Sequence, residues 1–132
     1  MVSVKKKMKV QRQSLDNILL SNVCEIRFLR KIPVAGKALT RRMWCTKSYD
    51  LLTSTNGKVS LNYRAPTNPK KVNESADNIL VVWDVFMQDY RAISMLECEL
   101  IQQIPANETF WQFFNENLYT MTAEQKAAFM NS

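Results

Sequence analysis

The chain has 132 residues, of which 46% are hydrophobic, and it carries 18 Lys and Arg residues against 12 Asp and Glu residues. These values fit a single domain with a buried core, and they exclude an intrinsically disordered protein. The sequence contains no histidine. This excludes Ser-His-Asp and Cys-His nucleophile pairs, an imidazole general base and histidine metal ligands.

The three cysteines, Cys24, Cys45 and Cys98, lie far apart in the sequence. They predict neither a zinc site nor the disulfide framework of a secreted protein, so we expect reduced thiols in the cytoplasm. Carboxylates such as Asp84 and Glu99 show no catalytic spacing, and the sequence has no glycine-rich phosphate loop. We therefore expect a protein that is not an enzyme and that binds neither a metal nor a cofactor.

No segment of the sequence predicts contact with a membrane. The longest apolar run, 79–83, has five residues, whereas a membrane-spanning helix needs about 20. The basic N-terminal stretch is not followed by the apolar segment of a signal peptide. Together with the cysteines, this predicts a cytoplasmic protein.

Charge is distributed very unevenly along the chain. Residues 1–71 have a net charge of +13, and residues 72–132 have a net charge of −7. A surface this basic is typical of proteins that bind nucleic acid or another polyanion through phosphate contacts. The alternative is that the two halves neutralise each other within the folded chain.

The predicted elements give three regions. Residues 1–12 predict a flexible basic arm, 13–104 a small β-domain with a leading helix, and 105–132 a helical appendage packed on that domain. Ser14 is a candidate cap for the leading helix, which would bury Leu15, Ile18 and Leu19.

The β-domain begins with alternating residues at 23–29, where Cys24, Ile26 and Phe28 would face the core while Glu25 and Arg27 face water. Residues 30–42 predict an extended basic loop and 42–46 a short strand. The Asn-Gly pair at 56–57 predicts a hairpin that joins 49–55 to a strand at 58–63.

A long polar loop follows at 64–78. Further strands are predicted at 79–87, 90–95 and 98–104, with a two-residue turn at 88–89. Asn107 or Thr109 would cap a helix over 107–118, and Thr122 with Gln125 forms a capping box for a last helix. These elements predict an α+β fold, a small antiparallel β-barrel of about five strands with one N-terminal and two C-terminal helices.

Two segments, 41–52 and 79–104, carry a resemblance to a known family. Its pattern is a basic and apolar strand that ends in Cys-Thr, followed by a Val-Trp-Asp, turn, aromatic-Arg hairpin. It is matched here by Cys45, Thr46, Val82, Trp83, Asp84, Tyr90, Arg91 and Ile93. The chain thus resembles the WYL-like phage proteins, which have an Sm-like, SH3-like β-barrel. The resemblance covers about half of the chain and implies a phage protein that acts in the bacterial cytoplasm. Related barrels bind RNA, DNA or protein segments.

The leading functional hypothesis is a nucleic-acid-binding regulatory protein. Its candidate phosphate-binding residues are basic, and Trp44 or Tyr63 would stack on a base. The candidate site comprises Lys5, Lys6, Lys7, Lys9, Arg27, Arg30, Lys31, Lys37, Arg41, Arg42, Trp44, Arg64, Lys70, Lys71 and Arg91. The sequence does not distinguish DNA from RNA.

The hairpin at 79–95 supports two interpretations. Trp83 and Arg91 would form a patch that stacks a base and binds a phosphate, or Trp83 is a core residue beside a structural pair of Asp84 with Arg91.

The alternative function is a protein-interaction module that redirects a host protein, such as part of the transcription machinery or a defence factor. Its contact would be the acidic, aromatic C-terminal half, through Phe110, Trp111 and Phe114. The competing interpretation of this aromatic stripe is that it packs on the protein's own core. The oligomeric state stays open.

Overall fold

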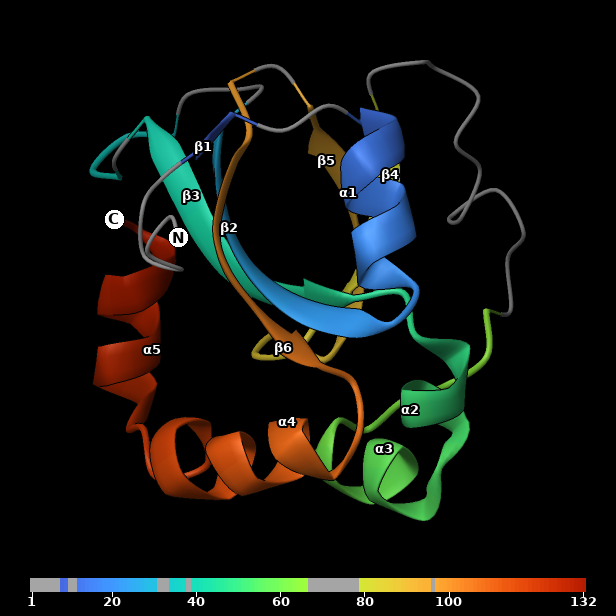
Figure 1. Ribbon diagram of the computed structural model, residues 1–132. Helices are drawn as coiled ribbons and strands as arrows, with labels where there is room; N and C mark the ends of the chain where they lie inside the picture. Colours follow the sequence, from blue (N-terminus) through green and yellow to red (C-terminus); the bar gives the residue numbers. More distant parts are fainter. Residues whose placement is uncertain (1–7, 10–11, 31–33, 38, 67–78, 96) are drawn as a thin grey trace.

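A computed structural model describes residues 8–9, 12–30, 34–37, 39–66, 79–95 and 97–132 (Figure 1). The chain is α+β with an antiparallel sheet, as predicted. The strands are β1 Met8–Lys9, β2 Asn22–Leu29, β3 Thr40–Thr46, β4 Ile79–Asp84, β5 Asp89–Ser94 and β6 Glu99–Pro105. The helices are α1 Arg12–Leu19, α2 Tyr49–Thr53, α3 Thr55–Ser60, α4 Glu108–Phe113, the π-helix η2 Phe114–Leu118 and α5 Ala123–Met130.

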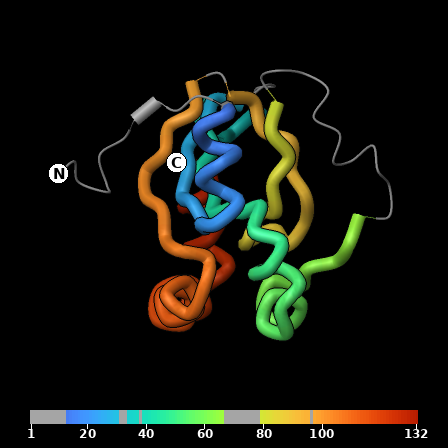
Figure 2. Tube along the Cα trace, turned by 45° about the vertical axis from the view of Figure 1, so that its right-hand side comes forward, coloured from blue at the N-terminus to red at the C-terminus, as the bar shows by residue number. Residues whose placement is uncertain are grey.

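The predicted closure of the strands into a barrel is wrong. The sheet is open, with the order β1-β6-β2-β3-β4-β5, so that β1 and β5 are its edges. Helix α1 lies in the curve of the sheet, between β2 and β6 on one side and β4 and β5 on the other (Figure 2). It fills the space that the strands would have to close around, and its Leu15 and Leu19 are fully buried there.

Both faces of the sheet are covered, and each has its own core. The aliphatic face, which packs against α1, consists of Leu15, Leu19, Cys24, Ile26, Phe28, Met43, Cys45, Leu80, Val82, Ile93 and Cys98. The aromatic face, which is covered by helices α2 to α5, consists of Val23, Trp44, Leu51, Leu52, Leu61, Trp83, Val85, Ile104, Phe110, Trp111, Phe114 and Leu118. Because side chains alternate along a strand, β2, β3 and β4 each supply residues to both cores.

This two-sided packing overturns the prediction that Glu25 faces water. Glu25 is buried on the same side of β2 as Val23. Its carboxylate accepts a hydrogen bond of 2.7 Å from Nε2 of Gln102 and lies 3.4 Å from Nη1 of Arg42. A buried carboxylate needs such partners, because removal of an ion from water is costly.

The predicted hairpin at 49–63 is also wrong, because α2 and α3 occupy this segment. The hydroxyls of Ser48 and Ser54 accept the backbone N–H groups of Leu51 and Gly57, which caps both helices. Gly57 is buried where a Cβ atom would fall on the carbonyl oxygen of Leu51. The glycine therefore permits close packing of α2 against α3, and it forms no turn.

The remaining predicted elements are confirmed with shifted boundaries. The strands at 23–29, 42–46, 90–95 and 98–104 correspond to β2, β3, β5 and β6, and 79–87 divides into β4 and a turn at 85–88. Asn107 caps α4, and the capping box of Thr122 and Gln125 begins α5 as predicted. Ser14 is not a cap, because α1 already begins at Arg12. Among the described helices, none has the length and apolar content that crossing a bilayer requires.

Candidate nucleic-acid interface

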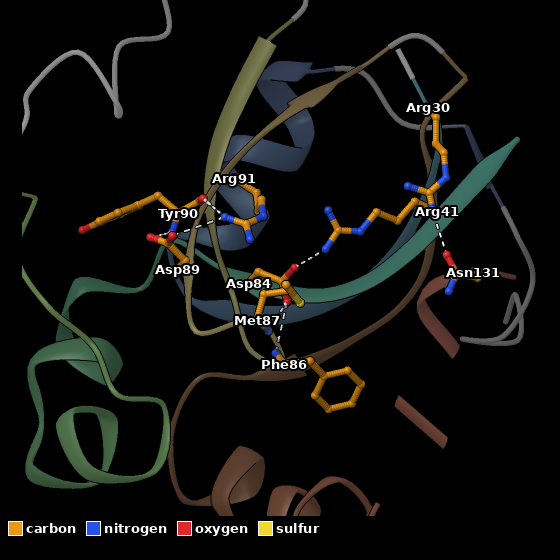
Figure 3. Close-up of polar contacts among 9 residues, drawn as sticks. All are labelled: Arg30, Arg41, Asp84, Phe86, Met87, Asp89, Tyr90, Arg91 and Asn131. Atoms are coloured by element: carbon orange, nitrogen blue, oxygen red, sulfur yellow. Dashed lines mark hydrogen bonds and ion pairs between the residues drawn. The ribbon is translucent and has the colours of Figure 1, made fainter. Parts of the chain in front are cut away.

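Two arginines from different strands lie on the aliphatic face of the sheet, and a third lies at its margin, directly after a strand. Arg41 shares its side of β3 with Met43 and Cys45, and Arg91 shares its side of β5 with Ile93. Arg30 follows β2, and its backbone N–H donates over 2.8 Å to the carbonyl of Leu39, the residue before β3. Figure 3 shows Arg41 between Arg91 and Arg30. We call Arg30, Arg41 and Arg91 the arginine cluster.

Asp84 anchors the cluster from the end of β4. Its side chain is fully buried, and its Oδ2 accepts a hydrogen bond of 2.6 Å from Nη2 of Arg41. Its Oδ1 accepts the N–H groups of Phe86 and Met87, both over 3.1 Å (Figure 3). One carboxylate thus closes the β4–β5 turn and fixes the direction of Arg41.

The sequence also predicted a pair of Asp84 with Arg91, and the strand register explains why a different pair forms. Arg91 lies opposite Val82, whereas Asp84 lies opposite Asp89. Arg91 instead donates to the Tyr90 carbonyl over 2.8 Å and lies 3.4 Å from Asp89. Arg30 donates to Oδ1 of Asn131, after α5, over 2.7 Å.

The electrostatics show that positive charge is crowded here. Burial lowers the pKa of Arg41, and the like charges of Arg91 and Arg30 lower it further, while Asp84 opposes the shift. Burial raises the pKa of Asp84, and this is opposed by its hydrogen bonds from Met87 and Phe86 and by Arg41. An arginine remains protonated at neutral pH even so. An anion bound beside Arg41 would therefore offset the repulsion that Arg41 experiences from Arg91 and Arg30.

The other described basic residues of the predicted site lie outside this cluster. Arg27 and Arg42 project from the opposite side of their strands and pair with Glu99 at 3.5 Å and Glu25 at 3.4 Å. The guanidinium of Arg42 also stacks 5.0 Å from the Phe129 ring centroid. The pair of Arg27 with Glu99 joins the basic and the acidic half, which supports the alternative that the halves neutralise each other, whereas Arg42 pairs within the basic half.

Two further predicted basic residues are exposed. Lys37 lies in the loop between β2 and β3. Arg64 donates to the Gln88 carbonyl over 3.1 Å, which places it beside the β4–β5 turn. Lys5, Lys6, Lys7, Lys31, Lys70 and Lys71 lie outside the described residues, as do the side chain of Lys9 and most of the predicted arm and long loop.

The predicted aromatic contact residues belong to the core. Trp44 is buried with its ring centroid 5.2 Å from that of Phe113, so it cannot stack on a base. Trp83 is buried and donates its Nε1–H to the Leu61 carbonyl. These positions correct the stacking role predicted for Trp44 and favour the core interpretation of Trp83.

The predicted protein-binding face is corrected in the same way. Phe110, Trp111 and Phe114 are buried, and their rings pack on one another with centroids 5.1 to 5.8 Å apart. They fill the space between α4, η2 and the sheet, so they are unavailable to a partner protein. The aromatic side chain that this region does expose is Tyr119.

Neither the arginine cluster nor the tyrosines near β5 were predicted as a group. Prediction of the cluster would have required knowing that β3 begins at Thr40. This start places Arg41 within the strand, so that its side chain points to the same side as that of Cys45.

Within the described ranges, Cys, Asp and Glu side chains form no group of three or more that would hold a metal ion. No family model, curated protein or solved structure matches the chain.

Proposed function

We propose that the protein is a non-enzymatic nucleic-acid-binding regulator that contacts phosphates through the arginine cluster. The observation that carries the proposal is the placement of Arg91 and Arg30 on either side of Arg41, whose own guanidinium is held by the buried Asp84. Guanidinium groups bind phosphate oxygens with two parallel hydrogen bonds, and such contacts supply most of the affinity for a nucleic acid.

The carboxylate that anchors the cluster does not oppose an anionic ligand. Asp84 already accepts three hydrogen bonds and is fully buried, so it does not face an incoming phosphate. Lys37 lies in the hairpin loop that joins Arg30 to Arg41, and Arg64 lies at the turn that precedes Arg91. These two exposed residues are further candidates for phosphate contact.

The setting of this function also remains a proposal. The described cysteines are free and buried, which fits a reducing compartment such as the bacterial cytoplasm. The resemblance to WYL-like phage proteins stays a prediction, and it is the basis for proposing a regulatory role in an infected cell.

The test is fluorescence anisotropy with labelled single-stranded and double-stranded oligonucleotides at several salt concentrations. We expect affinity to fall steeply with salt, because each phosphate contact releases a counterion. Arg91→Gln should weaken binding about tenfold, as expected for the loss of one charged hydrogen-bonding group. It should also reduce the slope of log affinity against log salt by about 1.

Lys58→Gln is the matched control, because it removes the same charge from an exposed position on α3. It should leave affinity and slope near those of the unaltered protein. Equal losses in Arg91→Gln and Lys58→Gln would contradict a localised site. Binding that does not depend on salt would contradict phosphate recognition altogether.

A further inference from the structure

A pocket of about 170 Å³ lies on the aromatic side of the sheet, between β4, β5 and the segment that carries α2. Trp83 is buried at its inner end, and the half-buried Tyr63 and Tyr90 line it. Tyr49 is exposed at the first residue of α2, and Lys47 precedes that helix. The pocket thus combines aromatic walls with a polar opening.

The aromatic walls are held in place before any ligand arrives. The rings of Tyr63 and Tyr90 both meet the Trp83 ring edge-on, with centroids 5.0 and 4.9 Å away. The Trp83 indole N–H is fixed by its hydrogen bond of 3.2 Å to the Leu61 carbonyl. Such preorganised aromatic surfaces bind a planar ring at little cost in conformational entropy.

Two hydroxyl groups give the pocket polar selectivity. The Tyr90 hydroxyl donates to the Tyr63 hydroxyl over 2.8 Å. Burial and then this hydrogen bond raise the pKa of Tyr90, so that the hydroxyl stays protonated. The Tyr63 hydrogen is left to donate to a ligand atom, while lone pairs on both oxygens can accept. A heterocycle with donor and acceptor atoms on its edge matches this pair better than a hydrocarbon ring does.

The volume of the pocket limits the size of the ligand that it can hold. A cavity of about 150 Å³ accepts a benzene ring, whereas pockets for larger ligands usually exceed about 300 Å³. The pocket therefore has room for one aromatic ring system and not for a peptide segment. Lys47 adds positive charge beside it, although its Nζ lies 2.6 Å from Asp16.

The pocket is also next to the proposed phosphate-binding surface. Tyr90 and Arg91 are neighbours on the edge strand β5 and point to opposite faces of the sheet. Arg64 follows Tyr63 directly in the chain and binds the turn that leads into β5. A backbone that passes around this edge would bring a phosphate to an arginine and the attached base to the tyrosines.

We propose that this pocket binds one unstacked base of a single-stranded nucleic acid, an inference that rests on the proposed function. A base inside a duplex is stacked and paired and is therefore withheld from the pocket. Single-stranded DNA or RNA should bind more tightly than a duplex of equal length.

The test compares Tyr49→Ala with Tyr119→Ala by anisotropy on a single strand and on its duplex. Both tyrosines are largely exposed, at 70% and 72%, but Tyr119 does not line the pocket. Loss of a stacking ring should weaken single-strand binding about tenfold. Duplex binding and the salt slope should not change, and Tyr119→Ala should behave as the unaltered protein. Equal losses on single strand and duplex, or no loss in Tyr49→Ala, would overturn the proposal.

A second measurement separates failure of the pocket from failure of the proposed function. The four nucleoside monophosphates are titrated into the protein while the Trp83 indole N–H signal is followed by NMR. A shift of this signal, reduced in Tyr63→Phe, supports the pocket even if no oligonucleotide binds. Oligonucleotide binding without any response at Trp83 would overturn the pocket and leave the arginine cluster intact.

Discussion

The two faces of the sheet are built from different chemistry. The aliphatic face packs mainly aliphatic side chains and three buried thiols against one helix, and the arginine cluster lies on this side of the strands and at their margin. The aromatic face is filled by three tryptophans and the phenylalanines of α4 and η2. In this protein the aromatic residues therefore form the core, whereas the candidate binding surface is where arginines lie close together.

The largest effect should come from truncation of the aromatic face. Phe110→Ala removes a fully buried ring and should lower the free energy of unfolding by about 3–5 kcal/mol. Tyr119→Ala, at an exposed position in the same region, should change it by less than about 0.5 kcal/mol. Urea denaturation of both variants measures the difference. A Phe110→Ala protein of unchanged stability would restore the docking interpretation of this region.

A slightly smaller effect is expected at the anchor of the arginine cluster. Asp84→Asn keeps an acceptor for the turn but removes the charge that holds Arg41, whose side chain is 17% exposed. Loss of a partner from a buried ion pair should cost about 3 kcal/mol.

The control for Asp84 is Glu99→Gln, which breaks the more exposed pair with Arg27. This change should cost less than about 1 kcal/mol. Similar losses of stability in both variants, measured by urea denaturation, would show that burial does not distinguish the two ion pairs.

The packing of α2 against α3 predicts an intermediate effect. Gly57→Ala places a Cβ atom on the backbone of Leu51 and should cost about 1–3 kcal/mol through overpacking. Val59→Ala, at an exposed position on α3, should be within about 0.5 kcal/mol of the unaltered protein. If thermal denaturation showed the opposite order, the hairpin predicted from the Asn-Gly pair would be favoured.

The smallest effect concerns the thiols of the aliphatic face. Burial raises the pKa of Cys24 and of Cys98 from 9.0 to about 12, and Cys98 adds to the shift of Cys24 while Glu99 adds to that of Cys98. The unfolded chain therefore releases these protons at lower pH than the folded chain. Stability should be full at pH 8 and should fall by about 1 kcal/mol per thiol by pH 10. Cys98→Ala should flatten this decline in urea denaturation at pH 8 and pH 10, and an unchanged profile would contradict it.

Sequence patterns predicted the positions of the strands and helices better than they predicted which side chains are buried. Periodicity located β2, β3, β5 and β6, and the spacing of Thr122 and Gln125 located the start of α5. The Asn-Gly pair led to the wrong prediction of a hairpin. The segment is helical because two serines cap its helices and because Gly57 allows close packing against α2. Local turn preference is weaker than packing between elements.

The candidate site was harder to predict because it depends on strand register. Arg41 and Arg91 were both predicted to contact phosphate, but their convergence required the offset that places Arg91 opposite Val82. The burial of Trp44 required knowledge that helices cover the second face of the sheet. Neither fact is encoded in a local stretch of sequence.

The most direct test of the central claim is an NMR titration of the arginine Nε–Hε signals with a short oligonucleotide. The arginine cluster predicts that the signals of Arg30, Arg41 and Arg91 shift together and saturate at one concentration. The signals of Arg27 and Arg42, which pair with Glu99 and Glu25 on the opposite face, should stay in place. Shifts confined to Arg27 and Arg42, or none in any of the five, would contradict the proposal that the aliphatic face binds phosphate.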